Sequence, residues 1–247
     1  MQLFIRLLIL TLLGSAPITA LQAQDASPAK SEKSAAASPK RTDVYHVFFV
    51  KAALGKAAAL ADFLKTPDPS ATGPQHSILL RHQDGDDWDY VAIEHIGAKA
   101  TVENPATAMP AAARALMDSH NDTFVNGPSW AEFAKEMGID GDSAKTAGSA
   151  YIVSVYRAAP GQRDGLEKML GEPPNAATDT SSGNVLMAHL EGGAWNFMAV
   201  ARYDLWQKFA TNESNSIAQT NKKEGGWFEL RDHVSFHNDT LADRILP

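Results

Sequence analysis

The chain has 247 residues and no cysteine, and 29 acidic against 22 basic residues give it a net charge of −7. The lack of cysteine excludes disulfides, thiolate zinc sites, iron–sulfur clusters and thioether-linked haem. The negative charge argues against nucleic acid or an anionic membrane surface as a partner, because both favour a basic protein surface.

The first 42 residues are predicted to lie outside the folded part. Residues 1–23 are typical of an export signal, with a short basic segment, an apolar run and small residues at Ala20 and Ala23 for cleavage. Residues 24–42 are rich in Ala, Ser, Lys and Pro, which predicts a disordered linker. We therefore expect a periplasmic or secreted protein that is not inserted in a membrane once the signal is cleaved.

Residues 43–137 are predicted to form a first α/β unit. β-branched and aromatic runs favour strands, apolar residues at a spacing of three and four favour helices, and an Asp-Gly pair between two strands favours a hairpin turn. The expected elements are a strand (44–50), a helix (57–64), the two strands of a hairpin (76–83 and 88–96) and two helices (110–124 and 130–137).

A linker over residues 138–148 leads to a second predicted unit, residues 149–247. It shows the same patterns in the same order: a strand (151–156), a helix (161–170), a hairpin (185–190 and 195–203) and a final helix (227–245). Each unit therefore has the order β-α-β-β-α. No fourth strand is evident: either each sheet has three strands, or a strand lies within the segment assigned to the final helix.

Two internal repeats indicate that the second unit is a copy of the first. Residues 78–88 align without a gap on residues 185–195, and the tetrapeptide His-Asn-Asp-Thr at 120–123 returns at 237–240. Self-similarity of this kind is the signature of a tandem repeat.

The element order resembles half of a ferredoxin-like fold, and a tandem pair resembles the dimeric α/β-barrel superfamily with both subunits in one chain. The resemblance implies an α+β fold in which two β-α-β-β-α repeats form an intramolecular pseudo-dimeric barrel, with facing sheets around a cavity. That superfamily includes cofactor-free monooxygenases, haem-handling enzymes, isomerases and stress-induced proteins, so the fold does not by itself define the activity.

The first hairpin is expected to supply most of a ligand-binding site. A two-residue turn would place several aromatic and charged side chains on one face of the hairpin, which we expect to face the cavity. With their counterparts in the second hairpin they are Arg81, Trp88, Tyr90, Glu94, Trp195 and Phe197. The structural alternative is that the tryptophans are core residues at the end of the sheet and that Arg81 pairs with Glu94 at the surface.

His82, Asp89 and Arg81 are the candidate catalytic residues. Asp89 lies opposite His82 in the predicted hairpin, where it could orient the imidazole as a general base, and Arg81 could stabilise an oxyanion. In the second hairpin Asn196 takes the place of Asp89. The alternative is that both imidazoles cap the hairpins, and the same face assignment puts His82 away from the cavity.

The repeated tetrapeptide contributes His120, Asp122, His237 and Asp239, which we expect to be structural. Both histidines lie on an apolar stripe of the predicted helices, so they should be buried and dock each helix onto its sheet. The alternative is that they meet at a shared cavity mouth. His233 and His237 are four residues apart, but no third ligand is indicated, so no metal site is predicted.

The sequence therefore favours an exported protein that binds a small apolar or aromatic molecule and has no evident catalytic signature. It has no glycine-rich phosphate loop and no nucleophile elbow, and we expect no cofactor. The alternative is a cofactor-free monooxygenase or isomerase that uses the His82–Asp89 pair. Oligomeric state is left open.

Overall fold

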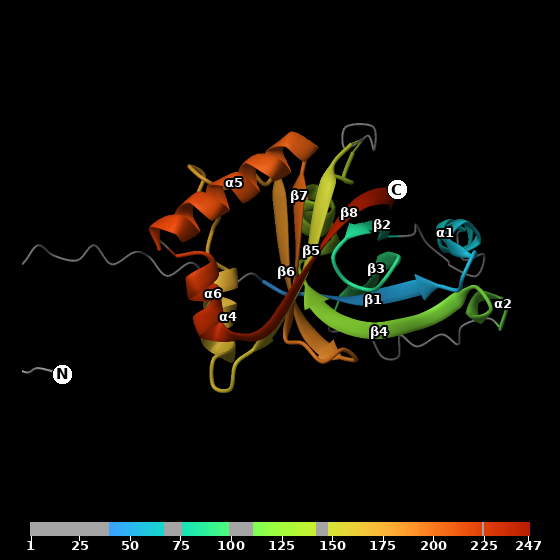
Figure 1. Cartoon of the computed structure of the whole chain (residues 1–247). Helices are drawn as coiled ribbons and strands as arrows, with labels where there is room; N and C mark the ends of the chain where they lie inside the picture. Colours follow the sequence, from blue (N-terminus) through green and yellow to red (C-terminus); the bar gives the residue numbers. More distant parts are fainter. Residues whose placement is uncertain (1–39, 67–75, 99–110, 142–147, 224) are drawn as a thin grey trace, which may run out of the picture. The chain divides into compact units, whose positions relative to one another are not determined.

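The computed structural model describes residues 40–66, 76–98, 111–141, 148–223 and 225–247. The predicted signal, nearly all of the first linker and most of the second lie outside these residues. The described part is an α+β fold in which eight antiparallel strands form a closed barrel with six helices (Figure 1). None of these helices is long and apolar enough to cross a membrane.

The first half of the barrel contains four strands and three helices. In chain order they are β1 (Asp43–Ala52), α1 (Ala57–Lys65), β2 (Ser77–Asp84), β3 (Tyr90–Ala98), α2 (Ala111–Arg114), β4 (Met117–Gly127) and α3 (Trp130–Glu136).

The second half also contains four strands and three helices. They are β5 (Ala150–Ala158), α4 (Arg163–Leu170), β6 (Gly183–Glu191), β7 (Phe197–Tyr203), α5 (Trp206–Lys222), α6 (Trp227–His233) and β8 (Val234–Leu246). The sequence did not indicate α5, which has no buried residue.

The strands close in the order β1-β3-β2-β8-β5-β7-β6-β4, with β4 paired to β1. Two junctions join the halves: β2 pairs with β8, and β6 pairs with β4. In each half the last strand therefore pairs with the first strand of its own half and with the first hairpin strand of the other half.

Two predicted helices proved to be mainly strands. Residues 117–127 form β4 and residues 234–246 form β8, so each half has a fourth strand where the helices 110–124 and 227–245 were expected. The helical spacing of the apolar residues was misleading, because pairing on both edges outweighs a local helical pattern. Only the short helices α2 and α6, directly before these strands, remain of the prediction.

The barrel interior is filled with apolar side chains, which alternate along each strand with side chains of the outer face. The largest inward-facing members are Tyr45, Ile78, Leu80, Ile93, Tyr151 and Met187. Phe133 of α3 and Met137, directly after this helix, join the cluster next to the starts of β1 and β5. On the outside, Leu60 of α1 covers the first half and Leu166 of α4 covers the second.

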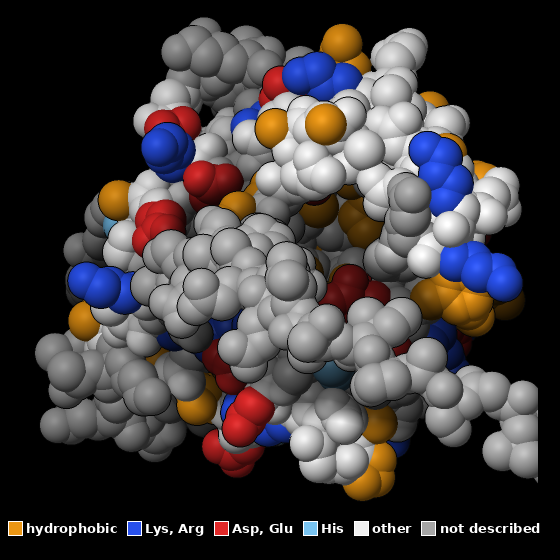
Figure 2. Space-filling view, turned by 90° about the vertical axis from the view of Figure 1, so that its left-hand side faces the viewer, with side chains coloured by type: hydrophobic (Ala, Val, Ile, Leu, Met, Phe, Trp, Pro, Cys, Tyr) orange, Lys and Arg blue, Asp and Glu red, His pale blue; other side chains and the backbone are white. Residues whose placement is uncertain are grey.

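Helices α5 and α6 carry apolar side chains that the barrel does not bury. Trp206, Ile217, Trp227 and Phe228 are all exposed. On the side that Figure 2 presents, the hydrophobic side chains drawn in colour are dispersed among Lys, Arg, Asp and Glu. Of the four exposed residues, Trp227 and Phe228 contact each other, with ring centroids 5.3 Å apart.

Each hairpin turn packs against the repeated tetrapeptide of the other half. The amide of Asp86 donates a hydrogen bond to Oγ1 of Thr240, and the amide of Gly193 donates one to Oγ1 of Thr123, each at 3.2 Å. Both threonines are almost fully buried. The threonines, and not the histidines, therefore link the two halves.

The histidines of the tetrapeptide lie on the outer face, because side chains alternate along a strand. His120 is 41% exposed and His237 is 22% exposed, 3.4 Å and 4.0 Å from Asp122 and Asp239. The prediction that they are buried docking residues on helices is therefore wrong.

The first half adds a second imidazole to this arrangement. His46 of β1 lies between two carboxylates, with Nδ1 3.1 Å from Glu94 and Nε2 2.8 Å from Asp122. Burial lowers the pKa of His46, but hydrogen bonds with Glu94 and Asp122 raise it by more, so the net shift is upward. In the second half Ile152 takes the corresponding place on β5.

Gly192→Ala should destabilise the protein far more than Gly161→Ala, although both glycines have positive φ angles (108° and 78°). A Cβ at Gly192 would lie 2.2 Å from the carbonyl oxygen of Asp122, whereas a Cβ at Gly161 meets nothing within 4 Å. We expect a loss of about 3 kcal/mol or more for Gly192→Ala and about 1 kcal/mol for Gly161→Ala in urea unfolding. Equal losses would show that the hairpin turn does not need this close approach.

His46→Gln should cost more stability in mild acid than in mild base. Because the folded pKa of His46 lies above its ordinary value, its stabilisation is fully present below about pH 6.5 and is lost as the pH rises through the folded pKa. The loss of unfolding free energy caused by the substitution is measured by urea unfolding near pH 5.5 and near pH 8.5. The two losses should differ by a few tenths to about 1 kcal/mol, since Glu94 and Asp122 are half exposed and screened by solvent. His237→Gln is the control, and a pH-independent loss at His46 would contradict the charge argument.

Candidate ligand-binding site at one end of the barrel

A cavity of about 340 Å³ opens at the end of the barrel where both hairpin turns lie. The ends of β1 and β5 and the starts of β4 and β8 meet there, because neighbouring strands are antiparallel. Its lining residues come from matching places in the two halves: Phe49 and Val155, Lys51 and Arg157, Asp86 and Gly193, Asp87 and Ala194, Trp88 and Trp195, and Ser119 and Phe236, with Val50, His120 and Asn121.

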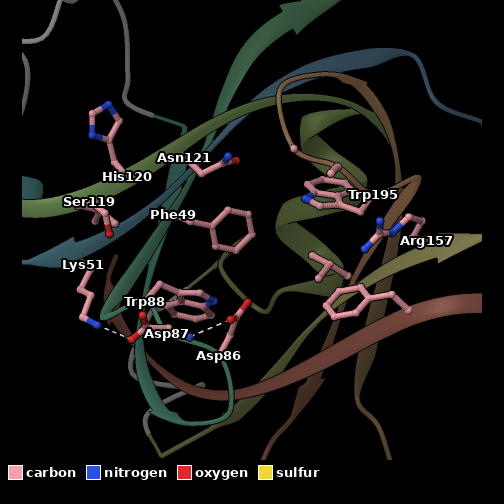
Figure 3. Close-up of a pocket in the computed structure, with 15 residues that line it drawn as sticks. Phe49, Lys51, Asp86, Asp87, Trp88, Ser119, His120, Asn121, Arg157 and Trp195 are labelled. Atoms are coloured by element: carbon pink, nitrogen blue, oxygen red, sulfur yellow. Dashed lines mark hydrogen bonds and ion pairs between the residues drawn. The ribbon is translucent and has the colours of Figure 1, made fainter.

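Four aromatic side chains form most of the apolar wall. The rings of Phe49 and Trp88 are 5.7 Å apart at their centroids, and Trp88 is almost fully buried. Figure 3 shows these two residues on one side of the cavity and Trp195 and Arg157 on the other. Phe236 completes the second side.

The charged side chains differ between the two sides. Lys51 forms an ion pair with Asp87, and this hydrogen bond raises the pKa of the Lys51 ammonium. Asp86 accepts a hydrogen bond from the amide of Asp87 at 2.8 Å. On the other side the guanidinium of Arg157 lies over the ring of Phe236, 5.4 Å from its centroid.

Two partly buried imidazoles contact the tryptophans edge to face. His82 lies 5.7 Å from Trp88, and His189 lies 5.2 Å from Trp195. In both rings Nε2 is inaccessible and has no hydrogen-bond partner within the described part of the chain. Burial lowers the pKa of His189, although a hydrogen bond with the backbone of Glu191 raises it in part. Burial therefore favours the neutral form of His189.

Asp89 bonds to the backbone of β1 and not to the ring of His82. Its carboxylate accepts a hydrogen bond from the amide of Ala52 at 2.7 Å, and Asn196 accepts the equivalent bond from the amide of Ala158 at 2.8 Å. These two residues join each hairpin to the first strand of its half. No side-chain bond between His82 and Asp89 occurs in the described structure.

The predicted cavity face of the first hairpin lies mostly on the outside of the barrel. Arg81 binds Asp243 through two hydrogen bonds of 3.0 and 2.8 Å, and Glu94 binds His46. The hydroxyl of Tyr90 donates a hydrogen bond to the carbonyl oxygen of Ala57, the first residue of α1. The prediction therefore turned the wrong face of the hairpin toward the interior. In the closed barrel the more apolar face of the hairpin points inward and packs in the core.

Of the six predicted ligand-binding residues, only Trp88 and Trp195 reach the cavity. Phe197 is fully buried on the outer face in the cluster with Leu166 of α4. Trp88 was paired with Gln83 in the prediction, but it precedes β3 and lies outside the observed pairing of β2 with β3. His120 lines the cavity edge, but Figure 3 shows its ring turned away from Phe49.

The sequence analysis missed Phe49, Lys51, Arg157 and Phe236. The first three could have been found from matching positions near the ends of β1 and β5, since inward-facing residues at the end of a strand line the mouth of a barrel. Phe236 had no such signal, because its segment was assigned to a helix. Within the described residues no group of three or more His, Asp or Glu side chains is arranged to hold a metal ion.

Two solved structures are similar to this chain, whereas no family model and no curated protein matches its sequence. An anthrone oxidase-like protein superposes with a TM-score of 0.50 over 83% of this chain and 92% of its own, at 9% identity. A protein from Lactobacillus acidophilus NCFM named as a "putative monooxygenase" superposes with a TM-score of 0.48 over 82% of this chain and 94% of its own, also at 9% identity.

At this identity the similarity bears on the fold alone. The superposition with the anthrone oxidase-like protein covers most of the eight-stranded antiparallel barrel and its helices. The chain therefore has an α+β, ferredoxin-like barrel fold.

Proposed function

We propose that the protein binds a small, flat aromatic molecule in the cavity between the two hairpin turns. The observation that carries the proposal is the set of four aromatic side chains from both halves, Phe49, Trp88, Trp195 and Phe236, around one open space. Small-molecule sites are typically concave and apolar, with a few polar groups that fix orientation.

The size of the cavity limits the ligand. A volume of about 340 Å³ lies near the lower end of the range for small-molecule sites, which suits one or two fused rings. Beyond the cavity the barrel is filled by its core, so the ligand would lie at the mouth and not deep inside.

Trp195→Leu should weaken the binding of 2-naphthol about tenfold, because aromatic contacts contribute about 0.5–1.5 kcal/mol beyond area burial. Isothermal titration calorimetry on the folded chain measures the change. Trp206→Leu is the matched control, since that exposed tryptophan lies on α5 and outside the cavity. Binding that is absent from the wild type, or equal in both variants, would overturn the proposal.

A cofactor-free oxygenase is the second candidate. Its support is the pair of partly buried imidazoles, His82 and His189, whose Nε2 atoms have no hydrogen-bond partner among the described residues and could act as bases. The name of the anthrone oxidase-like neighbour agrees with it. Such an imidazole would take a proton from a substrate methylene, and molecular oxygen would then oxidise that carbon to a carbonyl and form water.

This second candidate ranks below binding because the imidazoles contact the tryptophans and do not themselves line the cavity. An oxygen electrode with anthrone as the probe tests it. If His189 is the base, His189→Gln should lower the rate of oxygen uptake about 100-fold and leave 2-naphthol binding in place. No oxygen uptake by the wild type would rule it out.

We further propose that the two halves, 43–137 and 149–247, arose by duplication. The matched strand order and the matched hydrogen bonds of Asp89 and Asn196 support this. Export to the periplasm or medium is also a proposal, supported by the composition of residues 1–23. N-terminal sequencing of protein from a periplasmic extract tests it, and an intact Met1 would contradict it.

A further inference from the structure

We propose that the ligand of the cavity is an aromatic anion whose charge is bound by Arg157. This inference rests on the proposed function, since it assumes that an aromatic molecule binds in the cavity. It adds the chemical class of that molecule and the residue that selects it.

The argument starts from a difference between two matching cations. Lys51 follows Phe49 by two residues on β1, and Arg157 follows Val155 by two residues on β5, so both side chains come from the same place in their halves. Lys51 is neutralised by its ion pair with Asp87 in the first hairpin.

Arg157 has no such partner, because the second hairpin carries no carboxylate there. Gly193 and Ala194 take the places of Asp86 and Asp87. Within the described residues the guanidinium makes no ion pair and is held over the face of Phe236, 5.4 Å from the ring centroid. Stacking on a ring leaves the N–H groups at the edge of a guanidinium available, and their fork geometry matches a carboxylate.

The opposite wall directs the anion toward Arg157. Asp86 lines that wall, and among the described residues its carboxylate accepts one hydrogen bond, through a single oxygen. Figure 3 shows Asp86 beside Trp88, across the cavity from Arg157 and Trp195. Because like charges repel, an anionic ligand would place its ring between the aromatic walls and its charge at the Arg157 side.

The test compares 2-naphthoate with its neutral analogue 2-naphthamide by isothermal titration calorimetry on the folded chain. We expect the wild type to bind 2-naphthoate about tenfold more tightly, as a charge-assisted hydrogen bond at a partly exposed site allows. Arg157→Gln should remove this preference, so that the variant binds 2-naphthoate and 2-naphthamide with equal affinity. Arg163→Gln, the same substitution on α4 outside the cavity, should have no effect.

Asp86→Asn should act in the opposite direction and tighten 2-naphthoate binding about two- to threefold, because it removes a repulsive charge. Raising the salt from about 50 to 500 mM should reduce the preference for the anion in the wild type but not in Arg157→Gln. If both compounds bind equally to the wild type, the inference is wrong while the proposed function stands. If neither compound nor 2-naphthol binds, both are wrong.

Discussion

Closure of the barrel at its two junctions, β2 with β8 and β4 with β6, is the constraint on which the rest of the structure depends. A half with four strands has two open edges, and an open edge leaves backbone groups unpaired. Each half closes the other, because the last strand of one pairs with the first hairpin strand of its neighbour. The repeated His-Asn-Asp-Thr segment lies at these junctions. Its buried threonine accepts a hydrogen bond from a backbone amide in the hairpin turn of the other half.

The same closure creates the cavity. Each hairpin turn contacts the other half of the barrel. The two turns and their tryptophans therefore lie together at one end of the barrel. At the other end α3 inserts Phe133 and Met137 into the core. The barrel is therefore filled at one end and hollowed at the other, and the hollow is lined by both halves.

The two halves share a framework but differ in the charges they place on it. The first half pairs Lys51 with Asp87 and sets His46 between two carboxylates. The second half has Ala194 and Ile152 at the corresponding places, and its Arg157 guanidinium makes no ion pair with any residue that the structure describes. These differences lie outside the backbone contacts that hold the barrel together, so they can vary without loss of the fold.

The sequence by itself determined the first strand, the first helix and the hairpin of each half, because period-two alternation, helical spacing and glycine turns are local signals. The tryptophans of the cavity were also within its reach, because the hairpins repeat. Only the tertiary structure decided that residues 117–127 and 234–246 are strands, since both segments gain their hydrogen bonds from distant partners. It also decided which hairpin face turns inward, because that choice depends on the apolar interior that barrel closure creates.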